Sequence, residues 1–210
     1  MTETLRRTPA PVSLILLILV FGLPPAAGWL FISNPQWLPD RHKNRGTLIS
    51  PPRPLNELIL KDTKNRNFDW ANLSGHWTLA SYNKGGCESA CQQQLHEIQQ
   101  IRRAVGGERV RIERMLIQNA PSDPQILAQL ADQTKGMHLL FLESDNQHTF
   151  NKLFSVAGVH SDGAIFLIDP NGMLMMGYGA KNSSKDILKD LEILLKASSN
   201  WTKGVNNGHG

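Results

Sequence analysis

The chain opens with a long apolar run and continues as shorter alternations of apolar and polar residues. Residues 12–32 read VSLILLILVFGLPPAAGWLFI and contain no charged side chain. A helix needs about 20 apolar residues to cross the hydrocarbon core of a bilayer, so this run predicts a single transmembrane anchor. Arg6 and Arg7 precede the run. Because positive charge stays on the cytoplasmic side, they predict a cytoplasmic N-terminus at residues 1–11.

Two features of the anchor bear on whether it stays attached. Pro24 and Pro25 interrupt the run and would kink a spanning helix. The small residues that follow allow a cleaved signal peptide as an alternative, but a proline at the minus-three position makes a poor cleavage site. The apolar residues that continue to Ile32 favour an uncleaved anchor. Under both readings the rest of the chain is exported, on the periplasmic or equivalent side of an inner membrane.

Residues 33–60 are rich in proline and charged or polar side chains. Prolines forbid a long helix and favour extended backbone, so this segment predicts an arm between the membrane and a folded domain. Residues 61–199 are the predicted domain, and residues 200–210 a flexible tail. The prolines of the arm are Pro35, Pro39, Pro51, Pro52 and Pro54.

Within the predicted domain, strand-like and helix-like patterns alternate. Helices are predicted at residues 88–104, 122–131, 149–154 and 183–198. Strands are predicted at residues 76–82, 110–117 and 137–142, and in a hairpin of 164–168 with 174–178. The unbroken apolar character of 137–142 predicts a strand in the interior of the sheet.

This order of elements predicts an α/β domain with a mixed sheet that is flanked by helices on both faces. It resembles the thioredoxin-like fold, here preceded by an N-terminal transmembrane helix. The formal net charge of +4 comes from scattered side chains rather than a dense basic stripe, so we expect no nucleic-acid partner. Phosphate loops (GxxxxGK[ST]) and the GxSxG, HExxH and paired CxxC motifs are absent from the sequence. Nucleotide-binding, hydrolase and zinc-finger functions therefore have no support.

Cys87 and Cys91 are the only cysteines, and they lie four positions apart. A disulfide between them would close a very short loop and add little stability, so the pair indicates a chemical rather than a structural role. The predicted helix begins at the pair, and its N-terminus stabilises thiolate. Thiolates are soft ligands that favour Cu(I), and the same spacing permits a reversible disulfide. The pair is therefore a redox or a metal-binding site.

The stretch LSGHWTLASYNKGGCESAC, residues 73–91, resembles the Sco/SenC family of copper chaperones for cytochrome c oxidase. That family has an L-x-G-K-W segment, a strand and a CxxxC motif. Later in the chain it has a histidine just before a strand and a D-P-x-G turn. Here HSDGAIFLIDPNG, which begins at His160, has the same arrangement. The resemblance covers roughly residues 55–197, and an N-terminal anchor is usual in the family.

The resemblance implies that Cys87, Cys91 and His160 bind Cu(I), with Cu(II) as a further candidate. It also implies that the fold brings the His160 loop beside the cysteine helix. The motif departs from the family's C-P-x-x-C-P, because Glu88 and Gln92 stand where prolines are usual. The charge of Glu88 works against thiolate formation at Cys87.

Three functions follow, and the first is favoured. A metallochaperone would bind copper through the two cysteines and His160 and hand it to a respiratory oxidase subunit or to another assembly factor. A thiol–disulfide oxidoreductase would use the cysteines as a catalytic redox pair and would not need His160. A non-catalytic assembly or scaffold subunit would need none of the three. A methionine cluster, Met173, Met175 and Met176, is better explained by hairpin packing than by copper binding.

Overall fold

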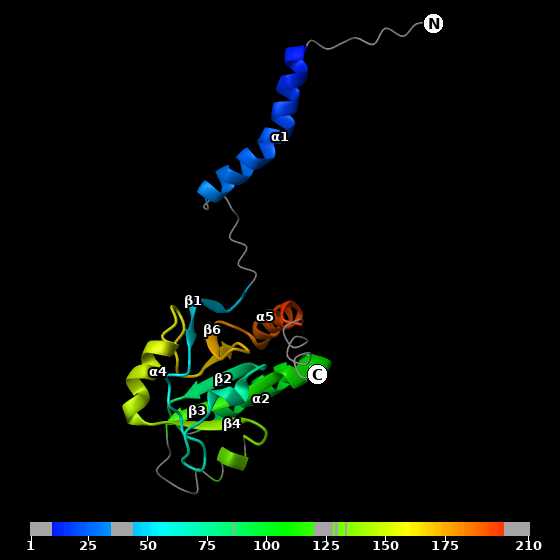
Figure 1. Ribbon diagram of the computed structural model, residues 1–210. Helices are drawn as coiled ribbons and strands as arrows, with labels where there is room; N and C mark the ends of the chain where they lie inside the picture. Colours follow the sequence, from blue (N-terminus) through cyan, green and yellow to red (C-terminus); the bar gives the residue numbers. More distant parts are fainter. Residues whose placement is uncertain are drawn as a thin grey trace, which may run out of the picture. The chain divides into compact units, whose positions relative to one another are not determined.

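The computed structural model describes residues 10–34, 44–85, 87–119, 128, 130–132 and 134–199. The chain divides into two compact units, Met1–Lys43 and Asn44–Gly210, whose helices and strands are drawn in Figure 1. The predicted tail at 200–210 lies outside the described residues. Of the helix predicted at 122–131, only residues 128, 130 and 131 are described, and all three are helical.

The described residues of the first unit form helix α1, Ala10–Ser33. Its segment Val12–Ser33 has a mean hydropathy of 2.3 and is long and apolar enough to cross a membrane. Pro24 and Pro25 lie inside the helix without ending it, and Figure 1 shows that the helix bends along its length. Asn34 follows the last helical residue, and its backbone N–H and its side-chain amide both donate to the carbonyl of Leu30, which satisfies this acceptor of the last turn.

The second unit is built on a six-stranded sheet with the order β1-β6-β5-β2-β3-β4. β2 pairs with β3 and β3 with β4 in parallel, whereas the β1–β6, β6–β5 and β5–β2 pairs are antiparallel. The sheet is therefore mixed, and the predicted fold class is confirmed. The strands are β1 Thr47–Pro54, β2 Trp77–Asn83, β3 Ile112–Asn119, β4 His138–Leu142, β5 Ala164–Ile168 and β6 Met173–Tyr178.

Helices cover both faces of this sheet. On one face α2 and α5 pack over Leu79 and Leu167 through apolar residues such as Ile98. On the other face α4 brings Phe150 and Phe154, whose rings stack with centroids 4.4 Å apart. The helices are α2 Ser89–Ala104, α4 Gln147–Phe154 and α5 Ser184–Ala197, with short 3-10 turns at Trp70–Leu73, Gly106–Arg111 and Ser144–Asn146.

The position of β4 differs from the prediction, because β4 is the last strand of the sheet and not an interior one. Its side chains from Leu139 to Leu142 are nevertheless at most 5% exposed. Both faces of the strand are covered, and Lys61 covers its outer edge by exchanging two backbone hydrogen bonds with Phe141, of 2.9 and 2.8 Å. An unbroken apolar run therefore reports burial on both faces, not the place of a strand in the sheet.

The Pro-rich segment contributes a strand to the folded unit rather than only an arm. Thr47 pairs with Gly177 and Leu48 with Met176, and the register then shifts before Arg53. Pro51 and Pro52 fall at this irregularity on an edge strand, where a missing N–H costs no ladder bond. The folded unit therefore begins at Asn44, well before the boundary predicted at residue 61.

A buried carboxylate fixes the start of this unit to α5. Asp190 is 2% exposed and accepts hydrogen bonds from the backbone N–H groups of Arg45 and Gly46 at 2.8 to 3.0 Å. The hydroxyl of Tyr178 donates to the same carboxylate at 3.2 Å. Burial, and then the charge of Asp190, raises the pKa of Tyr178 far above its usual value, so the hydroxyl stays a donor.

Replacing this carboxylate tests how much the clamp contributes. In Asp190→Ala, two backbone N–H groups and the hydroxyl of Tyr178 lose their acceptor, so we expect the free energy of unfolding to fall by about 3 kcal/mol. Urea unfolding of the full chain in a nonionic detergent, followed by tryptophan fluorescence, measures the change. Glu192→Ala, at an exposed position of the same helix, is the control and should change stability by less than about 0.5 kcal/mol. Equal losses in both variants would contradict the clamp.

Candidate functional site

A disulfide joins Cys87 and Cys91 at the start of α2, and their Cα atoms are 4.9 Å apart. Strand β2 ends at Asn83, the chain turns, and the helix begins at Ser89. Glu88 is the N-cap residue, and its side chain makes no capping hydrogen bond. Cys87 therefore lies just before the helix and Cys91 in its first turn. The predicted pair is brought together here as a disulfide.

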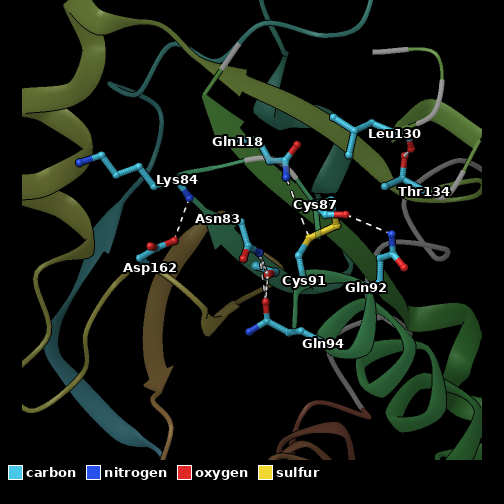
Figure 2. Close-up of a disulfide and its surroundings, with 11 residues drawn as sticks. Asn83, Lys84, Cys87, Cys91, Gln92, Gln94, Gln118, Leu130, Thr134 and Asp162 are labelled. Carbon is cyan, nitrogen blue, oxygen red and sulfur yellow. Dashed lines mark hydrogen bonds between the residues drawn. A yellow bond between two sulfur atoms is a disulfide. The ribbon is translucent and has the colours of Figure 1, made fainter. Parts of the chain in front are cut away.

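The two cysteines differ in their exposure to solvent. Cys91 is 4% exposed and packs against apolar side chains of β3 and β4, whereas Cys87 is only partly buried. Gln118, itself 1% exposed, points its amide Nε2 at the Cys91 sulfur from 4.0 Å. Figure 2 shows this amide on one side of the disulfide and Gln94 on the other. Cys87 is therefore the more accessible of the two cysteines.

Gln94 connects the cysteine helix to two neighbouring strands. Its Oε1 accepts hydrogen bonds from the Ser81 hydroxyl and from the Asn83 amide, both at the end of β2. Its Nε2 donates to the carbonyl of Gly163 at 2.7 Å, just before β5. Because Gln94 lies one turn after Cys91, these bonds fix the cysteine helix against the loop that carries His160.

Two further hydrogen bonds hold this loop to the end of β2. The backbone N–H of Gly163 donates to the carbonyl of Tyr82 at 2.9 Å. The backbone N–H of Lys84 donates to the Asp162 carboxylate at 2.8 Å, as Figure 2 shows. These two bonds place the loop beside the cysteine motif, as the resemblance implies.

Burial raises the pKa of the Tyr82 hydroxyl; a hydrogen bond with Gln147 opposes the shift, and the nearby charge of Asp162 adds to it.

His160 itself is exposed, and its Nδ1 lies 3.4 Å from the carbonyl of Asp162. Among the described residues, no three His, Cys, Asp or Glu side chains are close enough together to hold a metal ion. The structure thus unites Cys87 with Cys91 but does not place His160 with them as a ligand set. In this oxidised state both sulfurs are engaged with each other. Reduction would release two soft thiolates, which fit Cu(I).

Other residues weighed on sequence have structural roles. His96 is exposed, and its Nε2 lies 2.7 Å from the Gln100 amide nitrogen. Met176 is 2% exposed and packs in the core between the sheet, α2 and α5, as expected for a packing residue. Sequence reasoning did not single out Gln94, Gln118 or Asp162. Their residue types and spacing carry no distinguishing signal, because the partner of each lies on a different element.

Residues 77–198 match the family described as "Transmembrane-like, thioredoxin-like, C-terminal domain". The chain belongs to this family. No curated protein matches the sequence. The family's thioredoxin-like character agrees with the mixed sheet and with the cysteine pair at the start of the helix that follows β2.

Solved structures show the same fold at low sequence identity. Yeast Sco1 with copper bound is 19% identical with a TM-score of 0.53, over 66% of this chain and 90% of that chain. An SCO1/SenC family lipoprotein from Bacillus anthracis is 18% identical with a TM-score of 0.52, over 70% and 98%. The thioredoxin domain of a thiol-disulfide oxidoreductase from Bacteroides vulgatus is 14% identical with a TM-score of 0.50, over 71% and 96%. This family member therefore has a divergent Sco-like thioredoxin fold, which Sco proteins and oxidoreductases share.

The connection through Gln94 can be tested by one substitution. In Gln94→Leu the Ser81 hydroxyl, which is 0% exposed, loses its acceptor, so we expect unfolding free energy to fall by about 1–2 kcal/mol. Residues 161–164 should also exchange their amide hydrogens faster. Urea unfolding and hydrogen exchange measure the two effects. Gln93→Leu is the matched control, because Gln93 is exposed and makes only a 3.4 Å contact with Glu97. Unchanged exchange in Gln94→Leu would contradict the connection.

Proposed function

We propose that this protein is a membrane-anchored Cu(I) carrier that acts in the maturation of a respiratory cytochrome c oxidase. Its ligands are Cys87, Cys91 and His160, and copper is its cargo. The observation that carries the proposal is the single cysteine pair at the start of α2, with the His160 loop tied to the same helix through the bond from Gln94 to Gly163.

Reduction turns this pair into a soft two-sulfur site. Cys87 and Cys91 then face each other across a separation already short enough for a bond between them. The unsatisfied N–H groups at the start of α2 favour the thiolate form, which Cu(I) prefers. The Glu88 carboxylate opposes this and makes the thiolates less favourable than in a motif with proline there.

His160 supplies the third ligand by a movement of its own side chain and loop. The imidazole is exposed, and its neighbours Asp162 and Gly163 are bound to the end of β2 and to α2. The loop is thus kept near the sulfurs, while the ring is free to turn. Neutral imidazole is a good ligand for copper.

Copper leaves through Cys87, because this cysteine is the more exposed of the two. The recipient is an oxidase subunit or another assembly factor with soft ligands of its own. Helix α1 is long and apolar enough to keep the domain at the membrane that contains the oxidase, on its periplasmic or equivalent side.

The disulfide favours a second candidate function, thiol–disulfide exchange. In the reduced protein the Cys87 thiolate would attack a partner disulfide and form a mixed disulfide, and one partner sulfur would leave as thiolate. Cys91 would then attack Cys87, restore the disulfide seen here and release the second partner sulfur, so two electrons pass to the partner. The exposed and buried positions of the two cysteines suit these two steps.

A competitive copper titration tests the proposed ligands. The reduced full chain in nonionic detergent is titrated with Cu(I) against a chromophoric chelator, beside Cys87→Ser and His160→Ala. We expect one tightly bound copper per chain, weakened about tenfold or more by each substitution, because each removes a ligand. His148→Ala, which removes an exposed histidine of α4, is the control and should bind as wild type. Wild-type affinity no higher than that of Cys87→Ser would overturn the proposal.

Equilibration with glutathione separates the two candidate functions. We expect His160→Ala to keep the wild-type dithiol–disulfide equilibrium within about twofold, because exchange needs only the two sulfurs. Cys87→Ser should form no intramolecular disulfide. The fraction oxidised is measured by thiol alkylation and mass spectrometry. A protein that exchanges readily but binds no copper would support the oxidoreductase function in place of the carrier.

A further inference from the structure

A cavity of about 340 Å³ lies on the flank of α2 that faces β5, β6 and the start of α5. From α2 it is lined by Ala90, Gln93, Gln94 and Glu97, which recur at helical spacing and so share one face. Ala90 stands between the two cysteines in sequence, so the cavity begins beside the candidate site. Its volume lies within the range of small ligand-binding pockets.

Most polar side chains of the cavity wall are already engaged within the protein. Gln94 is bound to β2 and to Gly163, as described above. Asn182 accepts a hydrogen bond from the N–H of Gly179 at 3.0 Å and donates to the carbonyl of Arg45 at 2.9 Å. These amides fix the shape of the wall and leave little capacity for a ligand.

Among the described residues that line this cavity, Glu97 alone carries a charge. Its carboxylate accepts only long contacts, of 3.4 Å from Gln93 and 3.3 Å from the Ser184 hydroxyl. Within the part of the chain that the structure describes, no Lys, Arg or His lies within ion-pair distance of it. A half-buried carboxylate between fixed neutral walls favours a cation, because its charge is less screened there than on an open surface.

We propose that this cavity receives a lysine or arginine side chain from an extended partner segment whose cysteine meets Cys87, and that Glu97 selects that residue. The inference rests on the proposed function, since both copper transfer and disulfide exchange need a partner cysteine at Cys87. Cys87 lies just before Ser89, the first residue of α2, and from Ser89 to Glu97 the helix rises by about 12 Å. That length corresponds to about four residues of extended chain, so the basic residue stands close to the partner's cysteine in sequence.

Activated cysteine peptides measure this selection directly. The full chain carrying Cys91→Ser, in nonionic detergent, leaves Cys87 as its one thiol. Each peptide carries a cysteine as its 2-pyridyl disulfide and a lysine two, three or four residues before or after it. Cys87 attacks the peptide sulfur, a protein–peptide disulfide forms, and pyridine-2-thione leaves with the bonding pair and takes up the proton. Its absorbance gives the second-order rate constant.

We expect one lysine position to react about fivefold faster at low salt than the same peptide with norleucine, which has an uncharged chain. Glutamate at that position should react more slowly than norleucine. Adding Glu97→Gln to the Cys91→Ser protein should reduce the rate advantage of lysine to less than about twofold. In the protein that keeps Glu97, 0.5 M salt should also reduce this advantage. Glu143→Gln is the matched control. It removes an equal charge just after β4, at the same edge of the sheet, from a residue outside the cavity.

Equal rates for all lysine positions, or a preference that survives Glu97→Gln, would overturn the inference. A preference lost equally in Glu143→Gln would also overturn it, because a diffuse surface charge would then be the cause. The assay contains no copper, so a flat result leaves the copper titration standing. If one lysine position is preferred but the protein binds no copper, the result supports selection of the partner by the cavity, with disulfide exchange as the function that this selection serves.

Discussion

The hydrogen-bonded pairing of β2 on both of its edges is the constraint on which the candidate site depends. β2 is parallel to β3 and antiparallel to β5, and its side chains from Trp77 to Tyr82 are buried. The end of β2 therefore lies beside the end of β3 and the start of β5. The cysteine turn after β2, Gln118 of β3 and the His160 loop before β5 all lie at these strand ends.

Much of this arrangement could be predicted from the sequence, because it depends on local periodicity. The apolar stripe of α2, the hairpin across the Asp169 turn and the capping residue of α5, Ser183, all act over a few neighbouring residues. The strand formed by the Pro-rich segment was missed, since pairing with β6 is a long-range contact that prolines argue against locally. For the same reason the sequence placed β4 inside the sheet, although burial of its outer edge comes from Lys61.

The cysteine pair could be found from spacing alone, but its surroundings could not. Gln94 contacts β2 and Gly163, and Gln118 approaches Cys91 from a different strand, so neither contact has a sequence signature. The fold is one that copper-binding Sco proteins and thiol-disulfide oxidoreductases share. In the functions proposed above, copper binding needs His160 beside two reduced cysteines, whereas disulfide exchange needs the cysteines alone.

The clamp at Asp190 has a mechanical consequence. A pull on the anchor would reach the folded unit at Arg45 and Gly46, where the carboxylate holds the backbone to α5. The chain then continues into β1, whose backbone hydrogen bonds to β6 would carry the load next. The cysteine turn lies outside this load path, on β2 and α2. A pull from the N-terminal side would therefore meet the clamp at Asp190 before it reached the two sulfurs.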